Sequence, residues 1–238
     1  MMNECQTLKL MRKPGPPALL VSLPANDPDL ARAARDGGAQ GLKVHINIEH
    51  AAAQVRFGSL NDEAAQIEEI ASLGLPVGIV PGDGSRMAPP EDFRRLHELG
   101  LDFADLYLGA MPAWLLSALP IPLMAALGHE DMSRPDRLAS VATLTSIGMI
   151  EASIIPHAGY GNPLSAGDLA DYTTVTRVLG QADRPVMVPT QRHIVPDDLA
   201  ALASTGIRAL LIGAIVTERT AADISAATRV YREALDQL

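Results

Sequence analysis

The chain has 238 residues, of which 47% are hydrophobic and 20% are charged, so it can bury a large core. Only 3% are aromatic, so alanine, leucine, isoleucine and valine must build that core. The formal net charge of −9, with no basic run to offset it, argues against nucleic-acid or anionic-membrane partners. A local cationic pocket for a small anion remains compatible with this charge.

The cysteine count and the apolar runs bear on the compartment. Cys5 is the only cysteine, so no intrachain disulfide can form and a reducing cytoplasm is expected. The N-terminal segment lacks a continuous apolar stretch and carries Glu4, so it does not resemble a signal peptide. No apolar run approaches the roughly 18–20 residues needed to cross a bilayer. We therefore expect a cytoplasmic protein with no membrane partner.

Strand and helix signals alternate after a short N-terminal extension at residues 1–17. Residues 1–13 are expected to form a short helix or to fray before Pro14, Pro16 and Pro17. Apolar runs predict strands at Ala18–Leu23, Gln40–Asn47, Pro76–Val80, Asp102–Leu108, Pro122–Leu127, Met149–Ile155, Pro185–Pro189 and Arg208–Ile212. Caps, prolines and glycines predict helices at Pro28–Asp36, Asn61–Leu73, Pro90–Leu99, Pro112–Ala118, Pro135–Ile147, Ser165–Leu179, Pro196–Ser204 and from Ala221 onward.

The strand-then-helix unit repeats without a break in rhythm. Strands that alternate with helices favour a parallel sheet with right-handed crossovers. An open doubly wound sheet is the alternative, but Pro24-Ala25-Asn26 follows the first strand where that fold has a glycine-rich dinucleotide turn. We therefore predict a single α/β domain, a closed (β/α)8 TIM barrel over residues 18–238.

The second predicted strand carries a lysine in an unusual place. Strand side chains alternate with period two, so Lys43, His45 and Asn47 share the face opposite three apolar residues. Lys43 is the only lysine outside the N-terminal extension. The same alternation turns Asp105 and Glu151 inward on two other strands. Barrel active sites form at the carboxyl ends of the strands. The candidate catalytic residues are therefore Lys43, His45, Asp105 and Glu151.

Other polar residues sit on inward strand positions or in loops that follow a strand. Ser22, Tyr107 and Ser153 are further inward residues by the same alternation. Histidine suits proton transfer near neutral pH. We expect the substrate to be contacted by Asn47, His129, His157, Thr190 and Gln191. The loops at Gly159–Gly161 and at residues 48–61 are lid candidates because glycine hinges and length suit closure.

Lys43 admits more than one interpretation. It can form a buried ion pair with Asp105 or Glu151 that only fills the barrel, because an unpaired buried charge is very costly. It can instead face the mouth, where it holds an anionic oxygen, transfers a proton or forms a Schiff base. A metal held by His45, His129, His157 and a carboxylate is a further alternative, but no close ligand motif supports it. We assign no metal and no cofactor.

The chain resembles the ribulose-phosphate-binding barrels, and loosely N-acetylmannosamine-6-phosphate 2-epimerase. The resemblance rests on Leu30–Lys43, Arg184–Pro189, Val195–Leu199 and Ala209–Thr217. In that superfamily the loops after the seventh and eighth strands bind a phosphate, together with a short helix N-terminus. Backbone N–H groups and a helix N-terminus both favour an anion. The resemblance thus implies a phosphate site at Arg192, Gly213 and Ala214.

Two departures from the epimerase pattern affect the expected reaction. The family's catalytic lysine after the third strand is replaced by Val80-Pro81-Gly82-Asp83, and its acid after the seventh strand by Pro189–Arg192. We expect an enzyme that acts on a small phosphorylated metabolite by proton transfer next to a carbonyl, like a sugar-phosphate isomerase or epimerase. The alternatives are a Schiff-base aldolase or lyase using Lys43, and a non-catalytic barrel that binds a phosphometabolite. Many such barrels pair, so a homo-oligomer is left open.

Overall fold

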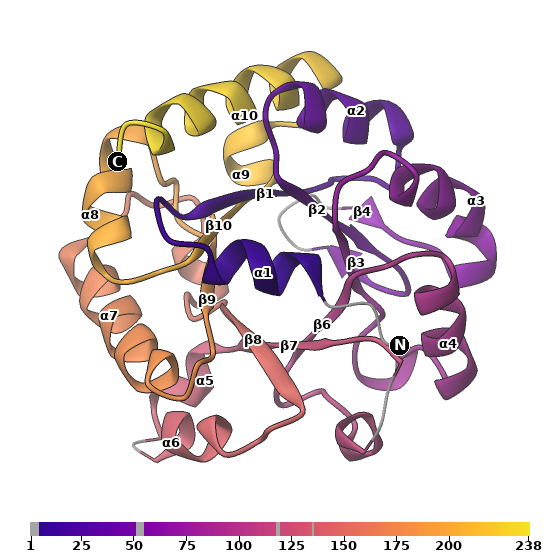
Figure 1. Cartoon of the computed structure of the whole chain (residues 1–238), viewed down its shortest axis with the longest axis horizontal. Coiled ribbons are helices and arrows are strands. Elements are labelled where there is room, and N and C mark those ends of the chain that lie inside the picture. The colour runs from indigo at the N-terminus through magenta and orange to yellow at the C-terminus, as the bar shows by residue number, and fades with distance from the viewer. Residues whose placement is uncertain (1–4, 51–54, 118–119, 135) are drawn as a thin grey trace.

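The chain folds into a closed barrel of parallel strands. The computed structural model describes residues 5–50, 55–117, 120–134 and 136–238. The barrel strands pair in the closed order β1-β10-β9-β8-β7-β6-β5-β2. Helices surround them (Figure 1), so the predicted (β/α)8 TIM barrel is confirmed. The barrel strands are β1 (Ala18–Ser22), β2 (Gly41–His45), β5 (Val77–Val80), β6 (Phe103–Tyr107), β7 (Leu123–Leu127), β8 (Ile147–Ala152), β9 (Val186–Pro189) and β10 (Ala209–Ile212).

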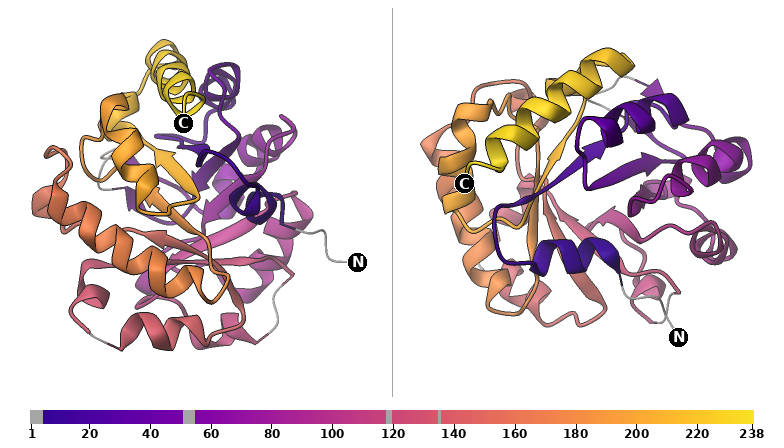
Figure 2. Two further views of the ribbon diagram at one scale, coloured as in Figure 1. Left: turned by 60° about the vertical axis from the view of Figure 1, so that its left-hand side comes forward. Right: turned by 45° about the horizontal axis from the view of Figure 1, so that its top comes forward.

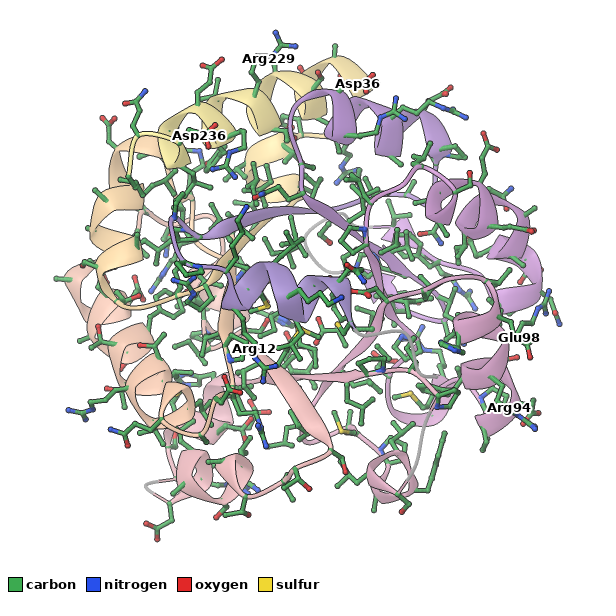
Figure 3. The ribbon with its side chains drawn as sticks, viewed as in Figure 1. Arg12, Asp36, Arg94, Glu98, Arg229 and Asp236 are labelled. Atoms are coloured by element: carbon green, nitrogen blue, oxygen red, sulfur yellow. The ribbon has the colours of Figure 1, made fainter. Side chains whose placement is uncertain are left out.

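The outer helices follow the sequence signals at most positions. These helices are α2 (Pro28–Asp36), α3 (Leu60–Ala71), α4 (Pro90–Glu98), α7 (Ala166–Gly180), α8 (Leu199–Ser204) and α10 (Ala221–Leu235). α10 packs beside α2, so the first and last outer helices adjoin (Figure 2). Exposed charged side chains such as Arg94, Glu98 and Arg229 point outward from the ring (Figure 3). Within the described residues, no helix is both long and apolar enough to cross a membrane.

Several connections differ from the prediction. The single helix predicted over Pro135–Ile147 is wrong, because α5 (His129–Met132) and α6 (Arg137–Ala142) precede β8, which already begins at Ile147. Thr143, Thr145 and Ser146 lie between α6 and β8, and such residues disfavour a helix interior. Residue 135 lies outside the described residues. Four short 3-10 turns are described, at η1 (Gly84–Arg86), η2 (Ala113–Leu116), η3 (His157–Gly159) and η4 (Pro196–Asp198).

Two further connections hold elements that the sequence patterns did not predict. The lid candidate at residues 48–61 contains the hairpin strands β3 (Glu49–His50) and β4 (Val55–Arg56), while residues 51–54 of this candidate lie outside the described residues. A short helix, α9 (Ala214–Thr217), follows β10 directly. The helix predicted over Pro112–Ala118 is the 3-10 turn η2, and residue 118 is not described.

Strand alternation separates two apolar clusters. The outward residues, such as Leu42 and Val44, pack against the helices. Between Lys43 and the amino-terminal end of the barrel, inward residues fill the interior. They are Leu20, Phe103, Met124, Met149, Met187 and Leu211. Gly78 makes room for one of them, because a Cβ atom there would lie 2.1 Å from Cζ of Phe103. The amino-terminal half of the barrel interior is therefore packed and apolar.

Helix α1 (Gln6–Arg12) closes the amino-terminal end of the barrel. In Figure 1 it lies across the centre of the ring of helices. Met11 joins the inward apolar cluster. The carboxylate of Asp102 accepts the backbone N–H groups of Gln6 and Thr7, both at 2.7 Å, and Arg208 donates to the carbonyl of Met11 at 2.9 Å. Both ends of α1 are thus fixed to the barrel, and the polar half of the interior faces the opposite end.

Candidate active site

A cavity of about 280 Å³ lies at the carboxyl ends of the strands. Lys43, Asp105 and Glu151 line it, together with His45 and Tyr107. A larger hollow of about 570 Å³ lies at the other end beside α1, but none of the inward charged residues lines it. Barrel enzymes place their chemistry at the carboxyl ends of the strands, so the smaller cavity is the candidate active site.

Lys43 bridges two buried carboxyl groups at this cavity. Its Nζ atom donates to Oδ2 of Asp105 at 2.8 Å and to Oε2 of Glu151 at 2.5 Å. The three side chains come from β2, β6 and β8 and are only 6%, 2% and 7% exposed. Period-two alternation points all three inward, and the barrel curvature brings them into contact. The structure therefore joins three of the four candidate catalytic residues in one cluster.

The two carboxyl groups hold different charges. Burial raises the pKa of Asp105 well above its usual range, and the negative charge of Glu151 raises it further. Burial also acts to raise the pKa of Glu151, but the Lys43 ammonium and hydrogen bonds from Asp105, Lys43 and Ser153 outweigh it and leave that pKa lowered. Asp105 thus keeps a proton where Glu151 is ionised. An acid and a base lie side by side.

The amine of Lys43 stays charged in this environment. Burial acts to lower its pKa, but attraction to Asp105 and Glu151 outweighs burial and leaves the pKa raised. Lys43 is therefore an ammonium that can hold an anionic oxygen. A Schiff base would require the neutral amine, which this cluster disfavours.

His45 is fixed by a polar network that the sequence did not reveal. The side-chain amide of Asn26 donates to the carbonyl of His45 at 2.6 Å and accepts its N–H at 3.2 Å. Asn26 also donates to Glu63 at 3.0 Å. The ring of His45 lies 3.5 Å from Oγ of Ser22 and packs against Phe57 with centroids 4.9 Å apart. The position of Asn26, just after β1, is the signal that could have identified it.

A group of hydroxyl side chains forms one wall of the cavity. Ser153 donates to Oε1 of Glu151 at 2.6 Å. Gln191 accepts the N–H of Ile155 at 3.1 Å and donates to Oη of Tyr160 at 2.6 Å. The ring of Tyr160 meets His157 edge to face at 5.0 Å. Sequence reasoning turned Ser153 inward and placed Tyr160 in a lid, but it assigned neither a role at the site.

Some of the predicted substrate and phosphate contacts line this cavity. These residues are His157, Thr190, Gln191, Gly213 and Ala214. Oγ1 of Thr190 accepts the N–H of Gly213 at 3.1 Å, which ties the loop after β9 to the loop after β10. The two loops that the family resemblance implied for phosphate are therefore adjacent in the structure.

Three predicted contacts do not line the cavity. Asn47 has a positive φ of 57° and donates its N–H to the carbonyl of Gly58 at 2.8 Å, so it turns the chain away from β2. His129 is exposed on α5. These residues are not brought to the substrate position that the sequence predicted, because the strand ends before Asn47 and a helix begins at His129.

Arg192 is the third predicted contact that does not line the cavity, because an ion pair holds its side chain away from it. Its guanidinium donates to both carboxylate oxygens of Asp168, at 3.0 and 2.8 Å, and to the carbonyl of Gly159 at 2.9 Å. Such a two-point pair is strong and directional. Asp168 also caps α7 with Ser165. Arg192 therefore fixes the start of α7 and the Gly159 loop, and the phosphate role expected of it is not supported by its position.

The histidines considered as metal ligands do not converge. His129 lies outside the lining of the cavity that contains His45 and His157. Over the described parts of the chain, no group of three or more histidine, cysteine or acidic side chains is arranged to hold a metal ion. The charged cluster of Lys43, Asp105 and Glu151 is thus the chemical centre of the cavity.

Comparisons with known proteins place the chain by its fold. No protein-family model matches it, and neither does any curated protein. Phosphoribosyl anthranilate isomerase from Thermus thermophilus superposes with a TM-score of 0.62 at 18% identity, over 92% of this chain and 98% of that one. The same enzyme from Thermotoga maritima gives 0.65 at 12% identity, over 93% and 100%.

A third solved structure broadens this likeness. Thiamine phosphate pyrophosphorylase from Pyrococcus furiosus superposes with a TM-score of 0.61 at 13% identity, over 92% of this chain and 96% of that one. None of these three is the epimerase that the sequence loosely resembles. At such low identity the likeness shows a shared fold, and it agrees with the closed ring of eight parallel strands. The chain shares the (β/α)8 barrel fold of these three proteins.

Proposed function

We propose that the protein is an enzyme that moves a proton next to the carbonyl of a small phosphorylated metabolite, as sugar-phosphate isomerases and epimerases do. The Lys43 ammonium held between Asp105 and Glu151 at the cavity supports this most directly. One carboxylate is enough to neutralise a buried ammonium. The second acid, which keeps its proton, suits acid–base chemistry, because perturbed acids in a cavity are typical of catalytic sites.

The cluster supplies each part of such a reaction. The carboxylate of Glu151 takes the proton from the carbon next to the carbonyl. The electrons of that C–H bond form a C=C bond, and the carbonyl electrons move to oxygen to give an enediolate. Lys43 stabilises the oxyanion, and the proton on Asp105 can be donated to it. Isomerisation follows when Glu151 returns its proton to the former carbonyl carbon while the neighbouring hydroxyl gives its proton back to Asp105. Epimerisation needs a proton delivered to the opposite face of the original carbon by a group other than Glu151.

The loops after β9 and β10 are the proposed phosphate position. Thr190, Gly213 and Ala214 line the cavity there, and Gly213 carries no side chain to obstruct an anion. The first N–H groups of a helix lack intrahelical acceptors, and α9 begins at Ala214. The names of the similar isomerase and pyrophosphorylase also refer to phosphorylated compounds.

Isotope exchange tests this function. The protein would be incubated in D₂O with a panel of phosphorylated aldoses and ketoses, and loss of the proton next to the carbonyl would be followed by NMR. We expect exchange with at least one member, reduced about 10²- to 10⁴-fold in Glu151→Gln, because that variant lacks the base. His129→Ala, outside the cavity, is the matched control and should exchange like the wild type.

The same experiment separates the alternatives. A non-catalytic barrel would bind a member of the panel, seen by calorimetry, without exchanging any carbon-bound proton. A Schiff-base enzyme would form an adduct on Lys43 that borohydride traps and mass spectrometry detects. The raised pKa of Lys43 predicts no such adduct.

A further inference from the structure

Glu151 is buried, yet a line of hydroxyl groups leads from it toward solvent. Its Oε1 atom accepts the proton of Ser153 Oγ at 2.6 Å. Glu151 itself is 5% exposed, whereas Tyr107, on the same wall, is 44% exposed. A base that takes a proton beneath a bound substrate needs a route by which that proton can leave, and hydroxyl groups can provide one because each both donates and accepts.

The barrel register places Tyr107 within reach of Ser153. Tyr107 on β6 pairs with Ala126 on β7, and Ala126 pairs with Glu151 on β8. Ser153 is the next inward residue after Glu151, and both serine and tyrosine line the cavity. Alanine has little bulk, so the tyrosine can extend over β7 toward β8. This register brings the two hydroxyl groups near each other, and although burial leaves the pKa of Tyr107 raised, Ser153 acts to lower it.

The donors along this line share one direction. The carbonyl oxygen of Gln191 accepts the N–H of Ile155, so its amide nitrogen is the atom that donates to Tyr160. Tyr160 lines the same cavity as Tyr107, and although burial leaves the pKa of Tyr160 raised, Tyr107 acts to lower it. At the other end an ionised Glu151 can only accept. Ser153 therefore donates to Glu151 in the resting state, and its oxygen can accept a proton from Tyr107.

We propose that Ser153 and Tyr107 form a proton relay between Glu151 and water at the cavity mouth, and that Tyr160 and Gln191 position it. The role of the relay in turnover rests on the proposed function. A Glu151 that carries a substrate proton becomes a donor, so Ser153 and Tyr107 turn to donate outward. The O–H bond of Glu151 then breaks as Ser153 gains a proton, Ser153 passes its own proton to Tyr107, and Tyr107 releases one to water. Each hydroxyl forms one O–H bond and breaks one, so no redox partner is needed.

An infrared experiment tests the relay without any substrate. The protonated carboxyl of Asp105 has a C=O stretching band that shifts in D₂O, and Asp105→Asn identifies the band by removing it. Asp105 and Glu151 both accept from the Lys43 ammonium and so lie side by side, which offers the Asp105 proton a route through Glu151. We expect Ser153→Ala and Tyr107→Phe to slow the shift by roughly tenfold or more in stopped-flow mixing. Tyr172→Phe removes a buried hydroxyl outside the cavity and should leave the rate unchanged. Equal rates in all these proteins would overturn the relay.

A second experiment reads the relay during turnover. A substrate from the isotope panel, deuterated next to its carbonyl, would be converted in H₂O. Ser153→Ala and Tyr107→Phe should retain more deuterium in the product than the wild type does, because the abstracted deuteron escapes less readily. Slower turnover with unchanged retention would show that these residues only position Glu151 and would contradict the relay. If no panel member reacts, the proposed function fails, while the infrared result still decides the relay.

Discussion

Lys43 is neutralised by Glu151, which makes Asp105 a second acid beside an existing ion pair. The ammonium contacts both carboxyl groups, and all three side chains are almost completely buried. A purely structural pair would be complete with one carboxylate. The proton kept by Asp105 avoids a second buried negative charge and leaves a donor beside the base. This division of charge gives the cluster its chemical capability.

The stability of the cluster depends on keeping Lys43. Lys43→Met should lower the free energy of unfolding by about 3–5 kcal/mol, because the buried Glu151 charge loses its counterion. Urea unfolding measures the change. The double variant Lys43→Met/Glu151→Gln should recover much of the loss, since it leaves no unpaired charge. A single variant within about 1 kcal/mol of the wild type would contradict the ion pair.

The protonation of Asp105 predicts a pH dependence with a defined sign. Its pKa in the folded state is raised above the usual 3.8, so between those values the folded state holds a proton that the unfolded state lacks. The stabilisation that this extra proton gives the folded state is complete below pH 3.8 and is lost as the pH rises. Asp105→Asn cannot titrate, so its stability relative to the wild type should increase as the pH rises above 3.8. Unfolding at several pH values measures this, and a difference that stays constant or decreases would contradict it.

At the residue scale the sequence predicts side-chain direction but not partners. Period-two alternation places Lys43, Asp105 and Glu151 inside the barrel without any structure. It cannot show that Arg192 is bound to Asp168, because Asp168 lies on the preceding outer helix, 24 positions earlier in the chain. A cationic residue in a strand-end loop fits a phosphate site and a loop anchor equally well, and only the fold distinguishes them.

Among the elements, α1 is attached to the barrel mainly through its ends. Burial, and then the charge of Asp102, raise the pKa of Cys5, the residue just before the helix, to about 12. The thiol therefore stays protonated and unreactive at neutral pH. Asp102 also accepts two N–H groups of the first turn, as a helix cap does.

Removing this cap should expose the thiol. In Asp102→Ala the first turn loses its acceptor, at a cost of about 0.5–2 kcal/mol, and Cys5 also loses a nearby negative charge. Both effects favour the thiolate, so a thiol reagent should label Cys5 several-fold faster than in the wild type. Cys5 is the only cysteine, so the signal is unambiguous. Asp36→Ala, at the exposed end of α2, is the control. Equal labelling rates in all three proteins would show that Asp102 does not hold α1.

The sequence predicts whether a segment is a helix or a strand more accurately than it predicts where that element begins and ends. Pro28–Asp36 is a helix with the bounds the sequence predicts, because Asp27 caps it, a proline begins it and Gly37 follows it. The connection before β8 is misjudged, because the hydroxyl residues that end α6 carry no proline or glycine signal. α9 and the β3–β4 hairpin are too short for a periodic pattern to reveal.

On the scale of the whole molecule, the two ends of the barrel have different roles. α1 and an apolar cluster close the amino-terminal end. The charged cluster, the hydroxyl wall and the loops after β9 and β10 surround the cavity at the other end. The rhythm of strands and helices predicts this polarity, since parallel strands bring all their carboxyl ends to one face. Loop residues determine which substrate binds, and loops have no repeating pattern from which their side-chain positions could be predicted.

The central claim is that Glu151 removes a proton from a carbon next to a carbonyl. NMR-monitored exchange in D₂O with phosphorylated aldoses and ketoses tests it most directly. We expect exchange by the wild type with at least one compound, and a loss of about 10²- to 10⁴-fold in Glu151→Gln with binding of the compound retained. Undiminished exchange in Glu151→Gln, or binding by the wild type without any exchange, would contradict it.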